Sequence, residues 1–276
     1  MTVYDFNIAD DGEAIEAKRK QKRYLLLIPK KGEQHEKLAR FLKSDFALKK
    51  QEGGVYIVRG NPKKLKKLLS EVTHIIFTRA RQIPKGNNLE TPDEFLAYKI
   101  VAYSLPKSTV QQRKKVQRLC EKAGALKIHR GVLLFPQLRK KDYKRFYSKA
   151  STLGLLDAKK ISESLREAGA YVSRWTRLRP LGTRSNDVLE ELVSSASRTE
   201  LKRLNRRIKG LLERSKKQET KLESLKSTYS SLRNQIRRLR IKYSLLYRIW
   251  GLDAKKEIHS SYNRLLRVKK HIMKNR

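Results

Sequence analysis

The sequence predicts an α+β protein in which two tandem ferredoxin-like (βαββαβ) units precede a long α-helical coiled-coil hairpin. Short apolar runs bounded by glycine and proline alternate with helical patterns twice over residues 24–182. Beyond Thr183 the proline and strand patterns cease, and an apolar heptad repeat follows. The expected domains are an acidic arm and basic linker at 1–23, ferredoxin-like units at 24–83 and 97–182 with a linker at 84–96, and a basic helical coiled-coil domain at 183–276.

The N-terminal segment reverses its charge within a few residues. Residues 1–17 contain five acidic and no basic residues, whereas the next six contain five basic ones. Such a segment is typical of a solvated arm. The alternative is an arm that folds back on the basic surface and competes with nucleic acid.

The first unit shows the order β-α-β-β-α-β. Asn61-Pro62 has the residue types of a helix N-cap and first-turn proline. The Gly53-Gly54 pair predicts a turn between two strands. The expected elements are strands at 24–28, 47–50, 55–58 and 75–77, a helix over 38–46, and a helix that Asn61-Pro62 opens.

The same order recurs in the second unit. We expect strands at 98–103, 132–135 and 170–178, a strand between Gly124 and Gly131, and helices at about 108–123 and 157–168. A shift of 77 superposes Pro29 on Pro106, Lys30 on Lys107, Leu42 on Leu119, and Gly54-Val55 on Gly131-Val132. Because these matches fall at the turns and element ends, they indicate a duplicated unit.

The C-terminal region carries a sustained a/d heptad. Ser215 and Gln218 interrupt it. A helix continuous from 201 to 250 would be about 75 Å long. Gly251-Leu252-Asp253 predicts a turn, after which a second helix can pack back. The seam residues are Leu201, Leu204, Ile208, Leu211, Leu222, Leu225, Tyr229, Leu232, Ile236, Leu239, Tyr243, Leu246 and Trp250.

The composition is strongly basic. The 276 residues include 67 Lys or Arg and 27 Asp or Glu, a formal net charge of +40. Residues from 181 onward hold 26 basic and 9 acidic residues, so both halves are basic. This excess favours a polyanionic partner, with nucleic acid first and anionic membrane next. No apolar run reaches the ~20 residues of a membrane span, and the lone Cys120 fits a reducing, cytoplasmic location.

Residues that support catalysis are sparse in the sequence. The five histidines stand apart, and no phosphate-binding Gly-x-x-x-x-Gly-Lys-Ser/Thr loop occurs. We therefore expect no enzyme activity, no metal and no cofactor, although folding can still bring distant carboxylates together.

The predicted nucleic-acid contacts are basic runs on expected helices, together with an aromatic between two arginines. Trp175 is that aromatic. Six other aromatics are expected in the core: Tyr56, Tyr103, Phe135, Tyr229, Tyr243 and Trp250. The candidate contacts are Lys63, Lys64, Lys67, Arg113, Lys114, Lys115, Arg118, Arg139, Lys140, Lys141, Arg174, Trp175, Arg177, Arg203, Arg206, Arg207, Arg233, Arg237, Arg238, Arg240 and Arg248.

One stretch resembles a known family. Its matching residues are Ser104-Leu105-Pro106, Arg113, Val116, Arg118-Leu119, Gly124-Ala125, Gly131-Val132, Leu134 and Pro136. This string resembles the N-terminal domain of the chromate-resistance regulator family (ChrB type), and the likeness extends over about 98–214. It implies a ferredoxin-like core and DNA-binding transcriptional control. The core is also similar to the small CRISPR adaptation subunit and to phenylacetate-type repressors. Ser104 stands near the place of the CRISPR family's metal-binding Asp, so that nuclease activity is not carried over.

The leading hypothesis is a non-enzymatic DNA-binding architectural or transcription-regulatory factor that uses extended phosphate contacts. The alternatives are a ribosome- or RNA-associated factor and a metal-dependent nuclease of the CRISPR small-subunit type. The expected location is cytoplasmic, with nucleoid or ribosome association. The 222–250 heptads allow a homodimer as well as pairing within the chain. The choice between DNA and RNA, sequence specificity, oligomeric state and any regulatory ligand stay open, as does whether the helical region is one long helix or a hairpin.

Overall fold

A computed structural model of the chain describes residues 23–28, 47–70, 72–81, 83, 97–142, 144, 152, 154–216 and 222–274. The acidic residues of the predicted arm, the helix expected over 38–46 and the linker at 84–96 lie outside these ranges. The chain divides into two compact units. The sheet unit comprises the described residues among 23–83, 97–138 and 157–193, and the helical unit comprises those among 139–156 and 194–274.

One antiparallel sheet runs through the sheet unit, so both predicted βαββαβ segments contribute to the same sheet. Among the described residues its order is β2-β3-β1-β4-β8-β5-β7-β6. The predicted strand positions are confirmed to within one or two residues at most ends. The bounds are β1 Arg23–Leu27, β2 Ala47–Lys50, β3 Val55–Arg59, β4 Ile75–Arg79, β5 Tyr98–Ser104, β6 Leu126–His129, β7 Val132–Pro136 and β8 Tyr171–Pro180.

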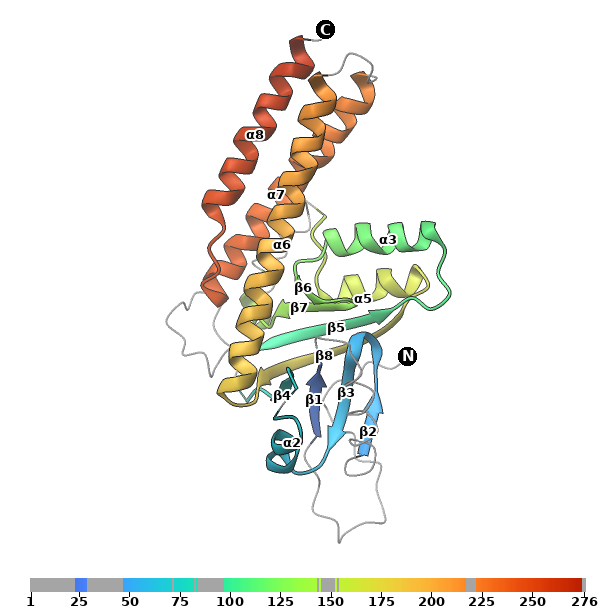
Figure 1. Cartoon of the computed structure of the whole chain (residues 1–276), viewed down its shortest axis with the longest axis vertical. Coiled ribbons are helices and arrows are strands. Elements are labelled where there is room, and N and C mark those ends of the chain that lie inside the picture. Colours follow the sequence, from blue (N-terminus) through green and yellow to red (C-terminus); the bar gives the residue numbers. More distant parts are fainter. Residues whose placement is uncertain are drawn as a thin grey trace. The chain divides into compact units, whose positions relative to one another are not determined.

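The strand order is symmetrical about the junction of β4 and β8 (Figure 1). In each half the fourth strand pairs with the first, the first with the third, and the third with the second. The two fourth strands pair antiparallel, with Phe77 opposite Pro180 and Arg79 opposite Leu178. The backbone therefore has the same connectivity on both sides of this junction.

Short helices cover the sheet. Asn61 caps α2 (Pro62–Leu68) as predicted, because its side-chain oxygen accepts from the Lys63 backbone N–H at 2.9 Å. A capping box between Thr109 and Gln112 opens α3 (Val110–Glu121). Asp157 caps α5 (Ala158–Glu167). Helices α3 and α5 lie side by side near β5 and β8 (Figure 1).

Consecutive buried residues on strands such as β1 and β7 form the core of the sheet unit, so both faces of these strands are covered. In its first half a buried cluster gathers around α2, with Leu65 and Leu69 of that helix packed among strand side chains. Burying such aliphatic side chains contributes roughly 1.5–3 kcal/mol each. The expected core aromatics Tyr56, Tyr103 and Phe135 are all buried.

Two glycine turns, one from each half of the sheet unit, contact each other. Gly53 lies in the single 3₁₀ turn η1 (Glu52–Gly54), and Gly131 lies between β6 and β7. A Cβ on Gly53 would approach the Gly131 carbonyl oxygen to 2.9 Å, and one on Gly131 would clash with the Tyr103 carbonyl oxygen. Both residues also have positive φ, at 64° and 80°. Side chains are therefore excluded where the two turns meet.

The helical unit consists mainly of three long helices (Figure 1). They are α6 (Thr183–Lys216), whose part from 194 belongs to this unit, α7 (Leu222–Trp250) and α8 (Lys255–Lys274). The sequence left open whether this region is one long helix or a hairpin, and the structure shows that α6 ends at Lys216 and α7 runs back along it. Ser215, one of the two residues that interrupt the heptad, is still helical and is buried near the end of α6.

Most of the heptad seam is buried within the single chain, whereas Leu222 and the expected core aromatics Tyr229 and Trp250 are half-buried. Leu225, Leu232, Ile236, Leu239 and Leu246 of α7 are all nearly inaccessible. The seam residues Leu204, Ile208 and Leu211 of α6, and Leu265 of α8, are buried as well. A homodimer through the 222–250 heptads is therefore not supported, because the apolar surface that it needs is already covered.

Candidate nucleic-acid interface

Most of the predicted cationic contacts are at the surface. The exposed ones are Lys63, Lys64, Lys67, Arg113, Lys114, Lys115, Arg118, Arg139, Lys140, Lys141, Arg177, Arg203, Arg206, Arg233, Arg237, Arg240 and Arg248. In the sheet unit Arg177 lies on β8, and the others are divided between α2 and α3, which lie over different halves of the sheet (Figure 1). The structure therefore does not gather these two basic runs into one patch.

The prediction that Trp175 contacts nucleic acid is wrong. Its side chain is 0% exposed, and it pairs with Ile100 across β8 and β5. Successive side chains on a strand point to opposite faces, so the half-buried Arg174 turns away from Trp175. The nearby arginines in the sequence therefore did not indicate an exposed indole.

Arg174 belongs to a partly buried group of charges. Burial lowers the pKa of the Lys99 ammonium, the nearby Asp157 carboxylate opposes that change, and Arg174 adds to it. Asp157 also caps α5 through the backbone N–H groups of Lys159 and Lys160. Arg174 is thus a half-buried cation whose charge repels that of Lys99.

Helix α7 gathers exposed cations along one face. Lys226, Arg233, Arg237, Arg240 and Arg248 are exposed and follow spacings of seven, four, three and eight residues. At 100° per residue these positions lie within one stripe of the helix, opposite its buried leucines. The helix carries seven basic residues and one acidic residue in all. We call these five residues the α7 cationic stripe.

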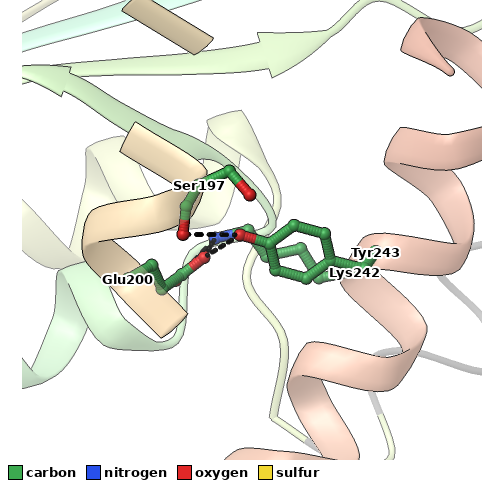
Figure 2. Close-up of polar contacts among 4 residues, drawn as sticks. All are labelled: Ser197, Glu200, Lys242 and Tyr243. Atoms are coloured by element: carbon green, nitrogen blue, oxygen red, sulfur yellow. Dashed lines mark hydrogen bonds and ion pairs between the residues drawn. The ribbon is translucent and has the colours of Figure 1, made fainter. Parts of the chain in front are cut away.

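A buried polar cluster sets the register between α6 and α7 (Figure 2). The Lys242 ammonium, whose residue is 3% exposed, lies 2.7 Å and 2.8 Å from the two Glu200 carboxylate oxygens. The Tyr243 hydroxyl lies 3.0 Å from Glu200 and 3.5 Å from the Ser197 carbonyl oxygen. Burial and the Glu200 charge raise the pKa of Tyr243, so its hydroxyl stays protonated.

Two of the predicted arginines serve the fold of the helical unit. Arg207 on α6 donates to the Gln235 side-chain oxygen on α7 at 2.7 Å. Arg238 is half-buried on the flank of α7. These guanidinium groups are held by the protein, whereas Arg233 and Arg237 have no acidic partner among the described residues.

A cavity of about 1140 Å³ lies between the end of α7 and the start of α8. Gly251, with φ of 67°, ends α7, and the Asp253 carboxylate accepts from the Lys255 backbone N–H at 2.8 Å to begin α8. The predicted turn at 251–253 is thus confirmed. The lining includes Arg240, Tyr243, Ser244, Tyr247, Arg248, Asp253, Lys255, Lys256 and His259.

Four residues of this cavity were missed as candidate contacts: Tyr247, Lys255, Lys256 and His259. Tyr247 stands outside the heptad seam and next to Arg248, which is a signal that the sequence does contain. The α8 residues could not be found in this way, because their place beside α7 depends on the direction in which the chain turns at Gly251.

Other classes of site have less structural support. The described residues contain no cluster of three or more His, Cys, Asp or Glu side chains placed to hold a metal ion. Within the same residues, no helix is long and apolar enough to cross a membrane. Comparison with protein-family models, curated proteins and solved structures finds no match to this chain.

Proposed function

We propose that this chain is a non-enzymatic nucleic-acid-binding protein that contacts the phosphate backbone through its helical unit. The observation that carries this proposal is the α7 cationic stripe, which presents five exposed cations on one helix face. Each phosphate that such a cation neutralises releases a condensed counterion, and this release supplies binding free energy. The flanking helix α8 adds exposed Lys255, Lys256, Arg264 and Arg267.

Side-chain contacts between α6 and α7 support this function. The Glu200–Lys242 and Arg207–Gln235 contacts hold α7 against α6 without using the stripe. The stripe is therefore carried on a helix whose rotation is fixed by other residues. Because the helix that carries these cations is already fixed, little further conformational entropy is lost when they contact phosphates.

The DNA-binding architectural or regulatory role stays our expectation, and RNA or ribosome binding is the second candidate. Backbone contacts carry no base information, so the stripe fits either polyanion. We further infer that the two halves of the sheet are tandem ferredoxin-like units, because their strand orders mirror each other. Gly54 and Gly131 occupy equivalent positions in the two halves, and the turns that contain them lie against each other.

The test is the salt dependence of binding to duplex DNA, structured RNA and ribosomes at equal concentration. Replacing both stripe arginines in R233Q/R237Q should reduce the slope of log K against log salt by about two, because two phosphate contacts are lost. The matched control R233K/R237K keeps both charges and should keep the slope. A wild-type protein that binds none of the three at low salt would refute the proposal. A slope equal in R233Q/R237Q and wild type would refute the role of the stripe.

A further inference from the structure

The cavity between α7 and α8 combines aromatic and cationic groups. Its volume of about 1140 Å³ exceeds the roughly 300–1,000 Å³ that is usual for small-molecule sites. The described residues that line it come from one continuous segment, 240–259, within the helical unit. The cavity therefore has room for more than one mononucleotide-sized group.

The aromatic component is Tyr247. Its side chain is 44% exposed, in contrast to the buried Tyr243 one turn earlier, which is held by Glu200. Large aromatic side chains on a helical bundle usually pack inward, and Tyr243 shows that this bundle follows that rule. Tyr247 instead presents a ring face or edge to a lined cavity, where a planar ligand can stack.

The cationic component surrounds that ring. Arg240 and Arg248 are eight residues apart on α7, or about 12 Å along its axis, and Tyr247 lies between them in height. The Arg240 guanidinium lies 5.3 Å from the centroid of the Tyr262 ring on α8, which holds it at the cavity edge. Lys255, Lys256 and His259 line the opposite side.

The described lining residues include one carboxylate, Asp253, whose oxygen accepts from the Lys255 backbone N–H at the start of α8. This hydrogen bond leaves the negative charge of Asp253 in place. Four lining cations, Arg240, Arg248, Lys255 and Lys256, outnumber it, so the described lining is net positive. The electrostatic complement of this lining is an anion with a flat, uncharged ring system.

We infer that the α7–α8 cavity binds single-stranded nucleic acid, with an unpaired base stacked on Tyr247 and the adjoining phosphates at Arg240 and Arg248. Duplex nucleic acid presents its phosphates but keeps its bases stacked inside the helix, so it does not use the tyrosine ring. Stacking on an aromatic ring is tolerant of base identity, and unpaired DNA and RNA share this chemistry. This inference rests on the proposed function and adds the class of strand.

Fluorescence anisotropy with labelled oligo(dT), oligo(U) and a short mixed-sequence duplex tests the inference. Y247A should weaken binding of the single strands about tenfold, within the range for loss of one stacked base. Y247F keeps the ring and should stay within about twofold of wild type. Y171A removes a tyrosine that is 64% exposed in the sheet unit and serves as the matched control. Circular dichroism confirms that each variant is folded.

The outcomes separate the two proposals. If the wild-type protein binds no nucleic acid, both fail. If the wild-type protein binds but Y247A weakens the binding of single strands and of duplex equally, this inference is overturned while the proposed function stands. The same holds if Y247A weakens the binding of neither. If Y247A also weakens the binding of polyglutamate about tenfold, the cavity is assigned to acidic peptides and this inference is overturned. Preferential loss on oligo(dT) or on oligo(U) identifies the strand.

A photo-crosslink gives an independent measurement. Oligonucleotides containing 5-iodouracil should crosslink to the α7–α8 segment, with Tyr247 or His259 as the modified residue. Crosslinks confined to the sheet unit would contradict the inference even if Y247A lowered the affinity, because the effect of that variant would then be indirect.

Discussion

The sheet unit and the helical unit hold their internal geometry by different kinds of contact. In the sheet unit, backbone pairing sets the strand register, and the turns at Gly53 and Gly131 touch through backbone atoms. In the helical unit, charged and polar side chains join the helices, as Lys242 does with Glu200 and Asn205 with Ser261 at 2.9 Å. Strands must share hydrogen bonds with neighbours, whereas helices satisfy their own, so helix register depends on side chains.

This difference explains why the basic residues could not be sorted from the sequence alone. In a bundle of helices, one cation can lock two helices while another on the next turn faces solvent. Lys242 and Arg237 are five residues apart and have these two roles. In the sheet unit, glycine and apolar residues fix the geometry, so the cations of α2 and α3 stay on the surface.

The largest expected effect is the loss of the backbone contact in the sheet unit. Gly131→Ala should destabilise this unit by at least about 3 kcal/mol, because it adds strain at positive φ to a clash with the Tyr103 carbonyl oxygen. The control Gly169→Ala has positive φ but no contact shorter than 3.4 Å, and should cost about 1–2 kcal/mol.

The two tryptophans of the chain report the two units separately, because Trp175 lies in the sheet unit and Trp250 in the helical unit. Urea unfolding in a Trp250→Phe background follows Trp175 alone. Equal midpoints for Gly131→Ala and Gly169→Ala would show that the close approach at Gly131 has no energetic weight.

The second effect concerns the side-chain contact in the helical unit. Lys242→Met should destabilise this unit by about 2 kcal/mol, because it leaves the partly buried Glu200 carboxylate without its cation. The double variant Lys242→Met with Glu200→Gln should recover part of the loss, since no charge then stays unpaired. Trp250 fluorescence in urea measures both. A double variant less stable than the single one would contradict the assigned cause.

The third effect compares how much the cations of each unit contribute to nucleic-acid affinity. Arg233→Gln with Arg237→Gln should weaken nucleic-acid affinity roughly tenfold at moderate salt, because both belong to the α7 cationic stripe. Lys114→Gln with Lys115→Gln on α3 removes the same charge from the sheet unit. Anisotropy titrations on one probe compare the pairs. An equal loss for both pairs would extend the phosphate contacts to the sheet unit, and a larger loss for the α3 pair would move them there.

The smallest effect is a pH dependence confined to the sheet unit. Burial lowers the pKa of His74, the hydrogen bond to the Val72 carbonyl oxygen opposes this, and the charges of Arg184 and Lys66 lower it further. The unfolded chain then binds more protons than the folded unit as pH falls below 6.5, so stability should decrease from neutral to mildly acidic pH. His74→Gln should flatten this dependence in Trp175-monitored unfolding. An unchanged slope would assign it to another group.

Local patterns predicted most of the described elements. Asn61-Pro62 opens α2, Gly251 ends α7, and the β1 to β8 strands lie close to their predicted positions. These features depend on residues near in sequence, through turn chemistry and apolar periodicity. The exposure of the candidate interface residues was predicted less well. The exposed arginines were among the candidates, but so were the fully buried Trp175 and the internally bonded Arg207.

By itself the sequence determined the element types, the two successive strand sets, the apolar seam and the excess of positive charge. The tertiary structure decided that β4 and β8 join both sets into one sheet, and that α7 turns back along α6. It also decided which cations are tied to the fold and which face solvent around Tyr247. The physical reason is that periodicity specifies which face of an element is apolar, whereas exposure depends on which other element covers that face.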